Sequence, residues 1–359
     1  MDIRDLERRA AEIAHGGLDL DATCLAFDAL LRRAVPFVVA AWSTHDPATG
    51  LFTSCTVSGL PKDLEREAQL FRWEFEEDEP NAFRDLIAAH DTVAILSETT
   101  DGELDRAGRF REMLGAYGCT DEIRAVLWAD GQPWGSATLY STEGRFSRDH
   151  VAAVEAVAPH AAHGLRLVLL RTAATRPEAV LEPPGILRAM SDGRVTAMTA
   201  PAERWLELGG SALVTAANVV AAAVRGRRDW PGASSRLPLP GGRILSLHAA
   251  RTAGDDADVA VIVDAARPVE VAEMLVDAYG LTPRQRQVLG LLLLGRTLTQ
   301  IARELGISEH TANDHRKAIY ARIGVGSRSE LAARLQSDQY DPRTHRGVPP
   351  SPYGGFLEH

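Results

Sequence analysis

Three polar side chains near the C-terminus, Asn313, Asp314 and Lys317, carry the donors and acceptors that read base edges in DNA. An asparagine amide pairs with adenine, a lysine donates to guanine, and a carboxylate accepts from the amino group of cytosine. Asn313 and Lys317 are four residues apart, so they share one face of a helix. We predict a recognition helix over residues 308–323 that enters the major groove and uses these three residues for base contacts.

Hydroxyl and basic side chains flank this helix and are suited to phosphate contacts. Such contacts come from arginine side chains, hydroxyls and helix N-termini, and they fix the register of a protein on DNA. The predicted phosphate-contacting residues are Thr297, Thr299, Thr311, Arg316, Arg322, Ser327 and Arg328. Three other arginines, at positions 296, 303 and 334, are interpreted as solvated surface charges.

Helix start and stop signals surround the predicted recognition helix. Thr282, Thr297 and Ser327 are each followed three residues later by Gln or Glu, which is the capping-box pattern, and Ser308 is a further N-cap candidate. Glycines at positions 295, 306 and 324 follow the first three helices, where a left-handed terminus favours glycine. Four short helices with a short turn between the second and third predict a helix-turn-helix unit.

The charge of this segment differs from that of the whole chain. Residues 281–335 contain nine Arg or Lys and four Asp or Glu, a net charge of +5, whereas the chain as a whole carries −10. A basic module on an acidic chain indicates local binding to phosphate. The alternative is a helical bundle that docks on an acidic protein.

Residues 281–335 resemble the LuxR-type DNA-binding domain of bacterial transcription regulators. The resemblance rests on residues 281–284, 288, 289, 295, 301, 302, 305, 307, 308, 311, 315, 319, 324, 325 and 327–330. It implies binding to double-stranded promoter DNA, usually as a homodimer, with RNA polymerase as a second candidate partner. Two positions depart from the family: Ala312 replaces its usual valine, and Arg316 occupies a usually apolar position.

Residues 1–171 predict an α+β sensor domain. Helices are expected at 3–16, 20–34, 63–75, 81–89 and 103–117, hairpins at 36–42 with 51–58 and at 122–129 with 134–140, a short strand at 93–96, and a long helix at 148–171. The stretches 119–126, 130–131, 134–135 and 146–147 resemble the GAF-type domains that precede LuxR-type helices in actinobacterial regulators.

This sensor domain is rich in aromatic residues, which predicts a small-molecule pocket. The candidate lining residues are Trp42, Phe71, Trp73, Phe75, Trp128, Trp134 and Tyr140. The alternative is that each of them is an ordinary core residue. The acidic run at 74–79 is interpreted as a solvated loop.

A linker at 172–184 precedes a smaller unit at 185–266. Helices are expected there at 202–208 and 211–225, a hairpin at 186–190 with 194–198, and strands at 236–239, 243–250 and 259–264. This order of elements resembles a small PAS-like domain. A connector helix at 267–280 then leads to the DNA-binding domain at 281–336, and residues 337–359 are expected to form a flexible tail.

Other features narrow the classes of function. Three widely spaced cysteines and no leader pattern indicate a cytoplasmic protein with reduced thiols, and no segment is apolar and long enough for a membrane. His160 and His163 lie three residues apart with no evident third ligand, so we expect no metal site. We expect no cofactor, because the sequence has no P-loop and no dinucleotide motif.

We predict an α+β multidomain protein: a GAF-like sensor, a PAS-like α+β domain and an all-α, four-helix LuxR-type helix-turn-helix domain. The predicted function is sequence-specific transcriptional regulation, not enzyme catalysis, under the control of an unknown small-molecule effector or protein signal. The alternative is a regulator that binds no DNA and uses the C-terminal helices to dock on a protein. A third hypothesis, an enzyme that uses the aromatic pocket, has no catalytic motif behind it.

Overall fold

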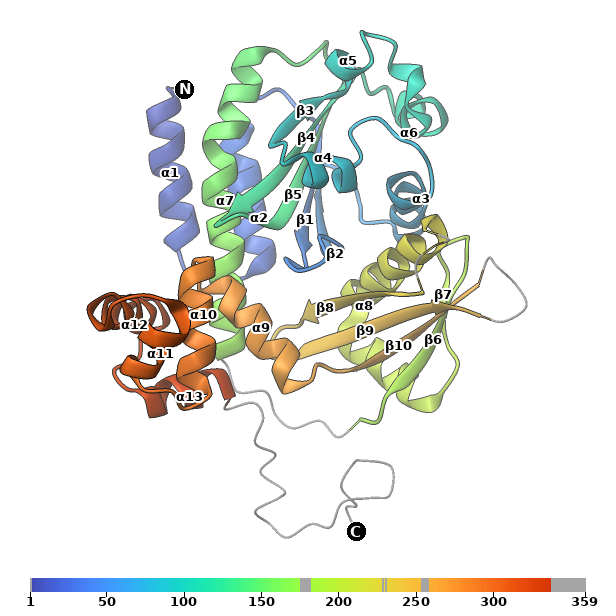
Figure 1. Cartoon of the computed structure of the whole chain (residues 1–359). Helices are drawn as coiled ribbons and strands as arrows, with labels where there is room; N and C mark the ends of the chain where they lie inside the picture. Colours follow the sequence, from blue (N-terminus) through green and yellow to red (C-terminus); the bar gives the residue numbers. More distant parts are fainter. Residues whose placement is uncertain (1, 175–181, 228, 230, 253–257, 337–359) are drawn as a thin grey trace. The chain divides into compact units, whose positions relative to one another are not determined.

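The computed structural model of the chain describes residues 2–174, 182–227, 229, 231–252 and 258–336 (Figure 1). The chain forms two compact units, residues 1–265 (unit 1) and residues 266–359 (unit 2). The predicted tail at 337–359, and most of the predicted linker, lie outside the described residues.

The first half of unit 1 contains a five-stranded antiparallel sheet in the order β2-β1-β5-β4-β3. Both predicted hairpins are confirmed, β1 with β2 and β4 with β5. The elements are α1 (Ile3–His15), α2 (Leu20–Leu31), β1 (Val39–His45), β2 (Phe52–Ser58), α3 (Leu64–Phe75), α4 (Phe83–Ala89), β3 (Val93–Ile95), α5 (Leu96–Thr99), η1 (Leu104–Arg106), α6 (Gly108–Glu112), η2 (Leu114–Tyr117), β4 (Asp121–Ala129), β5 (Gln132–Ser141) and α7 (Arg148–Ala174).

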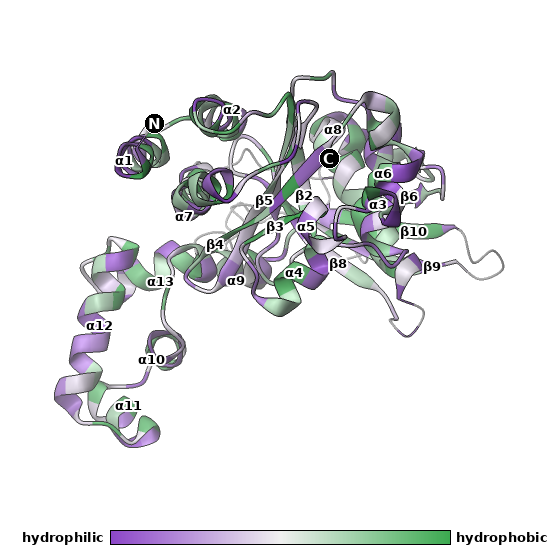
Figure 2. Cartoon of the chain, turned by 90° about the horizontal axis from the view of Figure 1, so that it is seen from above, coloured by the Kyte–Doolittle hydropathy of each residue, from purple (hydrophilic) through white to green (hydrophobic). Residues whose placement is uncertain are grey.

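Helices cover both faces of this sheet. Figure 2 shows α1, α2 and α7 beside one another along one side, with α3 and α6 on the other. Leu6, Ala10 and Ala14 recur at helical spacing on α1 and are buried, so this charged helix packs through one apolar face. Ser147 begins α7, since its Oγ accepts from the backbone N–H of His150 at 3.4 Å. The arrangement is the α+β fold expected from the sequence.

The prediction of one helix over 103–117 was wrong. The segment is broken into η1, α6 and η2, and none of these exceeds five residues. Gly108 lies where an added Cβ would be 2.6 Å from an oxygen of Glu79, so the backbone approaches a buried carboxylate there. Arg109, one of the charged residues of this segment, is 1% exposed and binds inside the protein.

The second half of unit 1 repeats the same strand order around one long helix. Its sheet runs β7-β6-β10-β9-β8, which matches the first sheet when its strands are numbered from one to five. The elements are β6 (Gly185–Ala189), β7 (Val195–Ala197), α8 (Ala200–Gly226), β8 (Ala233–Pro238), β9 (Ile244–Arg251) and β10 (Val259–Ala265). The predicted hairpin and three strands are confirmed. The finer assignment to a PAS-like domain stays a prediction.

Helix α8 combines the two predicted helices at 202–208 and 211–225. They meet at Gly210, whose backbone has φ 52° and ψ −143°, values that other residues rarely adopt. Among the described helices, α8 is the one long and apolar enough to cross a membrane. Most of it is buried against sheet and helix within unit 1, including Trp205 and Leu213, so it has the packing of a core helix.

The two sheets of unit 1 share one hydrophobic core. Phe52, Phe71 and Phe75 from the first half belong to the same buried cluster as Trp205 and Leu213 from the second. Polar bonds reinforce this packing: Arg236 of β8 binds Asp46 of the β1–β2 turn, and Arg225 binds Glu76. Thr215 of α8 also donates to Glu67 of α3. The two halves of unit 1 are therefore joined by both apolar and polar contacts.

The acidic run at 74–79 is not the solvated loop that we expected. Glu74 and Glu79 are each 4% exposed, and their partners are distant in sequence. Arg124 binds Glu74 at 2.7 Å, and Arg109 binds Glu79 at 2.8 Å and Glu122 at 2.5 Å. Burial of a charge is tolerated only when it is paired in this way, so the run is a structural ion-pair network.

The described part of unit 2, residues 266–336, contains helices and no strand, as predicted. Its elements are α9 (Pro268–Ala278), α10 (Pro283–Leu293), α11 (Leu298–Leu305), α12 (Glu309–Ile323) and α13 (Arg328–Gln336). The connector helix α9 belongs to this unit and packs against α13. Asp277 of α9 pairs with Arg286 of α10, and the guanidinium of Arg322 donates to the carbonyl of Gly280. The connector and the helices after it therefore form one body.

Candidate DNA-binding surface and ligand cavities

The helix-turn-helix of unit 2 is formed by local capping bonds. Thr282 and Thr297 each cap a helix in reciprocal fashion with the glutamine three residues later. Ser308 caps α12 by accepting from the N–H of Thr311 at 3.0 Å. Gly306 ends α11 with φ 64°, which places it in the left-handed region that glycine tolerates. These short-range bonds fix the turn between α11 and α12.

The inner face of α12 packs on α10 and α11. Ala312, Ile319 and Ile323 are at most 2% exposed, and Val288 and Ile301 on the facing helices are fully buried. Because the apolar stripe of α12 points inward, its other faces are left free for a partner. Ala312, where the family usually has valine, therefore lies in the core.

The three predicted base-contacting residues lie outside the buried stripe of α12. Lys317 is exposed and has no ion pair among the residues that the structure describes. Asp314 is exposed and lies 3.4 Å from His310. Asn313 is half-buried, and its amide oxygen accepts from Arg316 at 2.8 Å. Their contacts with bases stay a prediction, and Lys317 is the side chain most free to make one.

The seven predicted phosphate-contacting residues fall into two groups. Thr299 is exposed and has no side-chain hydrogen bond within the part of the chain that the structure describes, whereas Thr297 and Ser327 cap helices and Thr311 bonds to Ser308. The three arginines each have an internal contact: Arg316 with Asn313 and the ring of Tyr320, Arg322 with the carbonyl of Gly280, and Arg328 with the carbonyl of Arg296. A phosphate that binds these arginines or capping hydroxyls would therefore compete with the bonds that they already make inside the domain.

Residues 280–335 match the family model described as "Bacterial regulatory proteins, luxR family". This segment is a LuxR-type helix-turn-helix domain. An Aeromonas salmonicida protein named as an HTH-type transcriptional regulator in the exeN 3'region is 46% identical over 63 residues, 18% of this chain. The transcriptional regulatory protein MctR of Rhizobium johnstonii is 43% identical over 51 residues, 14% of this chain. The chain spans only 32% and 24% of these relatives, so the similarity covers the LuxR-type domain alone.

Unit 1 has weaker structural neighbours. The phycocyanobilin-bound GAF domain from a cyanobacterial phytochrome aligns with 48% of this chain and 97% of that domain, with 15% identity and a TM-score of 0.33. A TM-score this low gives no basis for assigning a ligand to unit 1. The description of unit 1 therefore rests on its own strands and helices.

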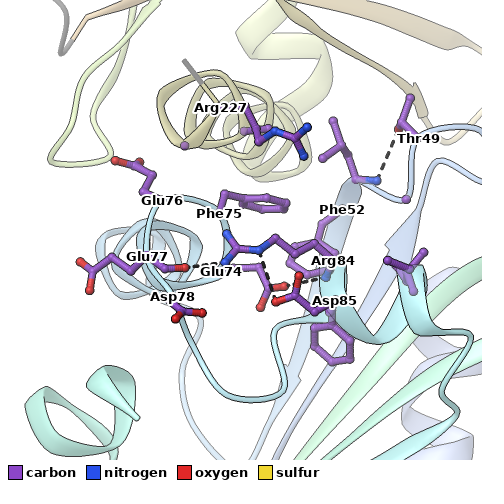
Figure 3. Close-up of a pocket in the computed structure, with 17 residues that line it drawn as sticks. Thr49, Phe52, Glu74, Phe75, Glu76, Glu77, Asp78, Arg84, Asp85 and Arg227 are labelled. Carbon is purple, nitrogen blue, oxygen red and sulfur yellow. Dashed lines mark hydrogen bonds and ion pairs between the residues drawn. The ribbon is translucent and has the colours of Figure 1, made fainter. Parts of the chain in front are cut away.

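One cavity of unit 1, of about 500 Å³, has seven charged residues in its lining (Figure 3): Glu74, Glu76, Glu77, Asp78, Arg84, Asp85 and Arg227. This polar cavity lies between the end of α3, the β1–β2 turn, α4 and the end of α8. Phe52 and Phe75 form part of its wall, and Figure 3 shows Arg84 lying between Phe75 and the carboxylates of Glu74 and Asp85. The main-chain carbonyl of Glu77 accepts from Arg84 at 2.5 Å.

A second cavity of unit 1, of about 300 Å³, is mainly apolar. It lies between the β2-β1-β5 part of the first sheet, α3 and η2. Its apolar lining includes Val39, Ala41, Val57, Leu60, Leu70, Met113, Leu114, Tyr117 and Tyr140. The size is at the lower end for small-molecule sites. We call it the apolar cavity.

The seven aromatic residues predicted for one pocket do not all line either of these two cavities. Tyr140 lines the apolar cavity and Phe75 lines the polar cavity. The other five make core contacts: Trp42 stacks on Phe27, Phe71 packs on Phe52, Trp73 is buried beside Gly108, Trp128 stacks on His90, and Trp134 donates to the carbonyl of Ala129. Strand alternation and helical periodicity send these side chains to different faces.

Sequence reasoning missed Glu67, which lines the apolar cavity. Its position was nevertheless detectable, because Glu67 lies four residues before Phe71 on the buried face of α3. A carboxylate on an apolar stripe is unusual and marks a site that needs an explanation.

Two cysteines also line the apolar cavity. Burial raises the pKa of Cys55 to about 12 and that of Cys119 to about 11, and nearby Glu67 and Glu122, respectively, add to these shifts. Both thiols are therefore protonated at neutral pH, a state that reacts slowly with oxidants.

Proposed function

We propose that this chain is a transcription regulator that binds promoter DNA through its LuxR-type domain and whose binding is controlled by a small molecule or protein signal acting on unit 1. In this proposal the chain is a cytoplasmic homodimer rather than an enzyme, and it acts with RNA polymerase. The observation that carries the proposal is the exposed side of α12, with Lys317 unpaired among the described residues, on a segment that matches the LuxR family.

The proposed roles within the domain follow the geometry. Asn313, Asp314 and Lys317 read bases, and Thr297, Thr299, Thr311, Arg316, Arg322, Ser327 and Arg328 supply phosphate contacts. Unit 2 carries the connector helix as part of the same body. A signal can act only by stabilising one arrangement of the two units over another, because a ligand shifts an equilibrium through its differential affinity.

Replacement of Lys317 by alanine is expected to weaken binding to the specific promoter site about 5- to 150-fold, the effect of losing about 1–3 kcal/mol of base discrimination. The measurement is a gel shift with DNA from upstream of the protein's own coding sequence, repeated against competitor DNA of scrambled sequence. The difference in affinity between the specific DNA and the scrambled DNA should therefore become smaller. Arg328→Ala should instead weaken binding to both DNAs and reduce the salt dependence.

The matched control is Arg106→Ala, which removes one exposed positive charge from unit 1. It should leave both affinities within about twofold of the unmodified protein, since single surface changes have small effects. Unchanged specific binding by Lys317→Ala and Asn313→Ala would contradict the base-contact assignment. A chain that binds no DNA at low salt would favour the alternative, a helical module that docks on a protein.

A further inference from the structure

The apolar cavity contains one buried charged group whose bonding is incomplete. The carboxylate of Glu67 is on the cavity wall and the residue is 7% exposed. Its Oε2 accepts from the hydroxyl of Thr215 at 2.8 Å, whereas Oε1 is buried with no hydrogen bond. Burial raises the pKa of Glu67, because a carboxylate removed from water is disfavoured.

The nearest cation, Lys62, forms an ion pair with this oxygen but no hydrogen bond. The ammonium of Lys62 lies 3.6 Å from Oε1, beyond hydrogen-bond distance, and donates instead to the carbonyl of Cys55 at 3.0 Å. A buried acceptor without a donor costs about 1–3 kcal/mol, so Oε1 is suited to accept a bond from a bound molecule.

The other charged side chains that line the cavity already bond to other groups of the protein. The carboxylate of Asp63 caps α3 by accepting from the N–H groups of Glu65 and Arg66. The guanidinium of Arg66 lies 3.3 Å from Asp63 and 5.1 Å from the centre of the Tyr117 ring. Among the described residues that line the cavity, Oε1 of Glu67 is thus the charged acceptor left for a ligand.

We propose that the apolar cavity binds a small apolar amine whose protonated nitrogen donates to Oε1 of Glu67. The inference rests on the proposed sensing function and adds the chemical class of the signal. The apolar walls hold the hydrocarbon part, and the ammonium pairs with the carboxylate. A neutral hydroxyl can donate to Oε1 but carries no charge to pair with the carboxylate, and an anion is repelled by the charge of Glu67.

The position of Glu67 also links this ligand to the second sheet. Its other oxygen is bonded to Thr215 of α8, a residue that is 1% exposed. One carboxylate therefore contacts both the bound amine and the long helix that the second sheet packs on. Binding of the amine in the cavity therefore affects the position of α8 through the side chain of Glu67.

The test is calorimetric titration of the full chain at pH 7 with three probes that share one apolar body: 2-phenylethylamine, 2-phenylethanol and phenylacetate. The amine should bind most tightly. Glu67→Gln should weaken amine binding on the order of 10- to 100-fold, the effect of losing a charge-assisted hydrogen bond, and leave the alcohol within about twofold. Glu65→Gln, which removes an exposed carboxylate from the same helix, should leave all three affinities unchanged.

A second variant locates the site. Val57→Phe fills the apolar cavity from β2 without touching the carboxylate, and it should abolish amine binding. Amine binding that survives Val57→Phe, or that equals the binding of the alcohol, overturns the proposal, as does tighter binding of phenylacetate or no binding of the amine. The titration needs no DNA, and the gel shift needs no amine. Failure of the amine-binding proposal is therefore distinguishable from failure of the DNA-binding proposal.

Discussion

Replacement of Arg109 by methionine is expected to lower the free energy of unfolding of unit 1 by about 3–5 kcal/mol, the usual effect of breaking a buried ion pair. The guanidinium is 1% exposed and binds Glu79 at 2.8 Å and Glu122 at 2.5 Å. It also donates to the carbonyl of Pro80 at 2.8 Å. Methionine fills similar space but leaves two buried carboxylates without this partner.

The loss of stability caused by Arg109→Met should depend on pH. Burial disfavours charge on Glu122, but Arg109 and Arg124 outweigh it and hold its pKa below the usual range. A carboxyl with a lowered folded pKa stabilises the fold above its unfolded pKa of about 4.3, and this contribution is lost as pH falls through the folded pKa. Without Arg109 the carboxyls favour protonation. The cost of the variant should therefore be greatest at pH 7 and smaller at pH 5.

Tryptophan fluorescence during urea unfolding measures this effect. All six tryptophans of the sequence precede residue 266, so the signal reports unit 1. Arg111→Met, which removes a half-exposed arginine from the same short helix, is the control and should change stability by less than about 1 kcal/mol. An equal cost at pH 7 and pH 5 would show that lost packing, rather than unpaired charge, destabilises the variant.

Replacement of Asp46 by alanine is expected to destabilise unit 1 by about 3–5 kcal/mol, because it removes a buried carboxylate that accepts three bonds from Arg236. Asp46 is 1% exposed and accepts from the backbone N–H of Arg236 at 2.8 Å, from Nε at 3.0 Å and from Nη2 at 2.5 Å. The bond joins the β1–β2 turn to β8, so its loss should weaken the contact between the two sheets.

A double-mutant cycle separates the ion pair from the turn. Asp46→Ala combined with Arg236→Met should be less destabilising than the sum of the single changes by about 1–3 kcal/mol. Asp101→Ala, at a carboxylate 91% exposed, should stay within about 0.5 kcal/mol of the unmodified protein. Additive single effects would mean that Asp46 acts through its backbone partners, the N–H groups of Ala48 and of residue 236, rather than through the guanidinium of Arg236.

The helix-turn-helix was predictable because its determinants are local. A cap at Thr282, Thr297 or Ser308 involves bonds to residues at most three positions away, and glycine at 306 ends a helix by its own backbone freedom. The hairpins at 39–58 and 121–141 were predictable for the same reason, since alternation and turn residues lie within short windows.

The ion-pair network and the cavities were not predictable, because their partners are distant in sequence. Glu74 meets Arg124 fifty residues later, and Glu67 meets Thr215 at a separation of 148. Residues 74–79 taken alone carry only negative charges, and such a local pattern predicts a solvent-exposed segment. Residue type alone also could not place the seven aromatic residues relative to one another, since the faces they occupy depend on the packed fold.

The shared core of unit 1 has a consequence for how such regulators can be recombined. A chain cut after the first sheet would expose Phe52, Phe71 and Phe75, which pack together with Trp205 on α8. The smallest part of unit 1 that can be transferred intact to another DNA-binding domain is therefore residues 1–265, with both sheets. A junction at residue 266 preserves that core and leaves the connector helix with the DNA-binding domain that holds it.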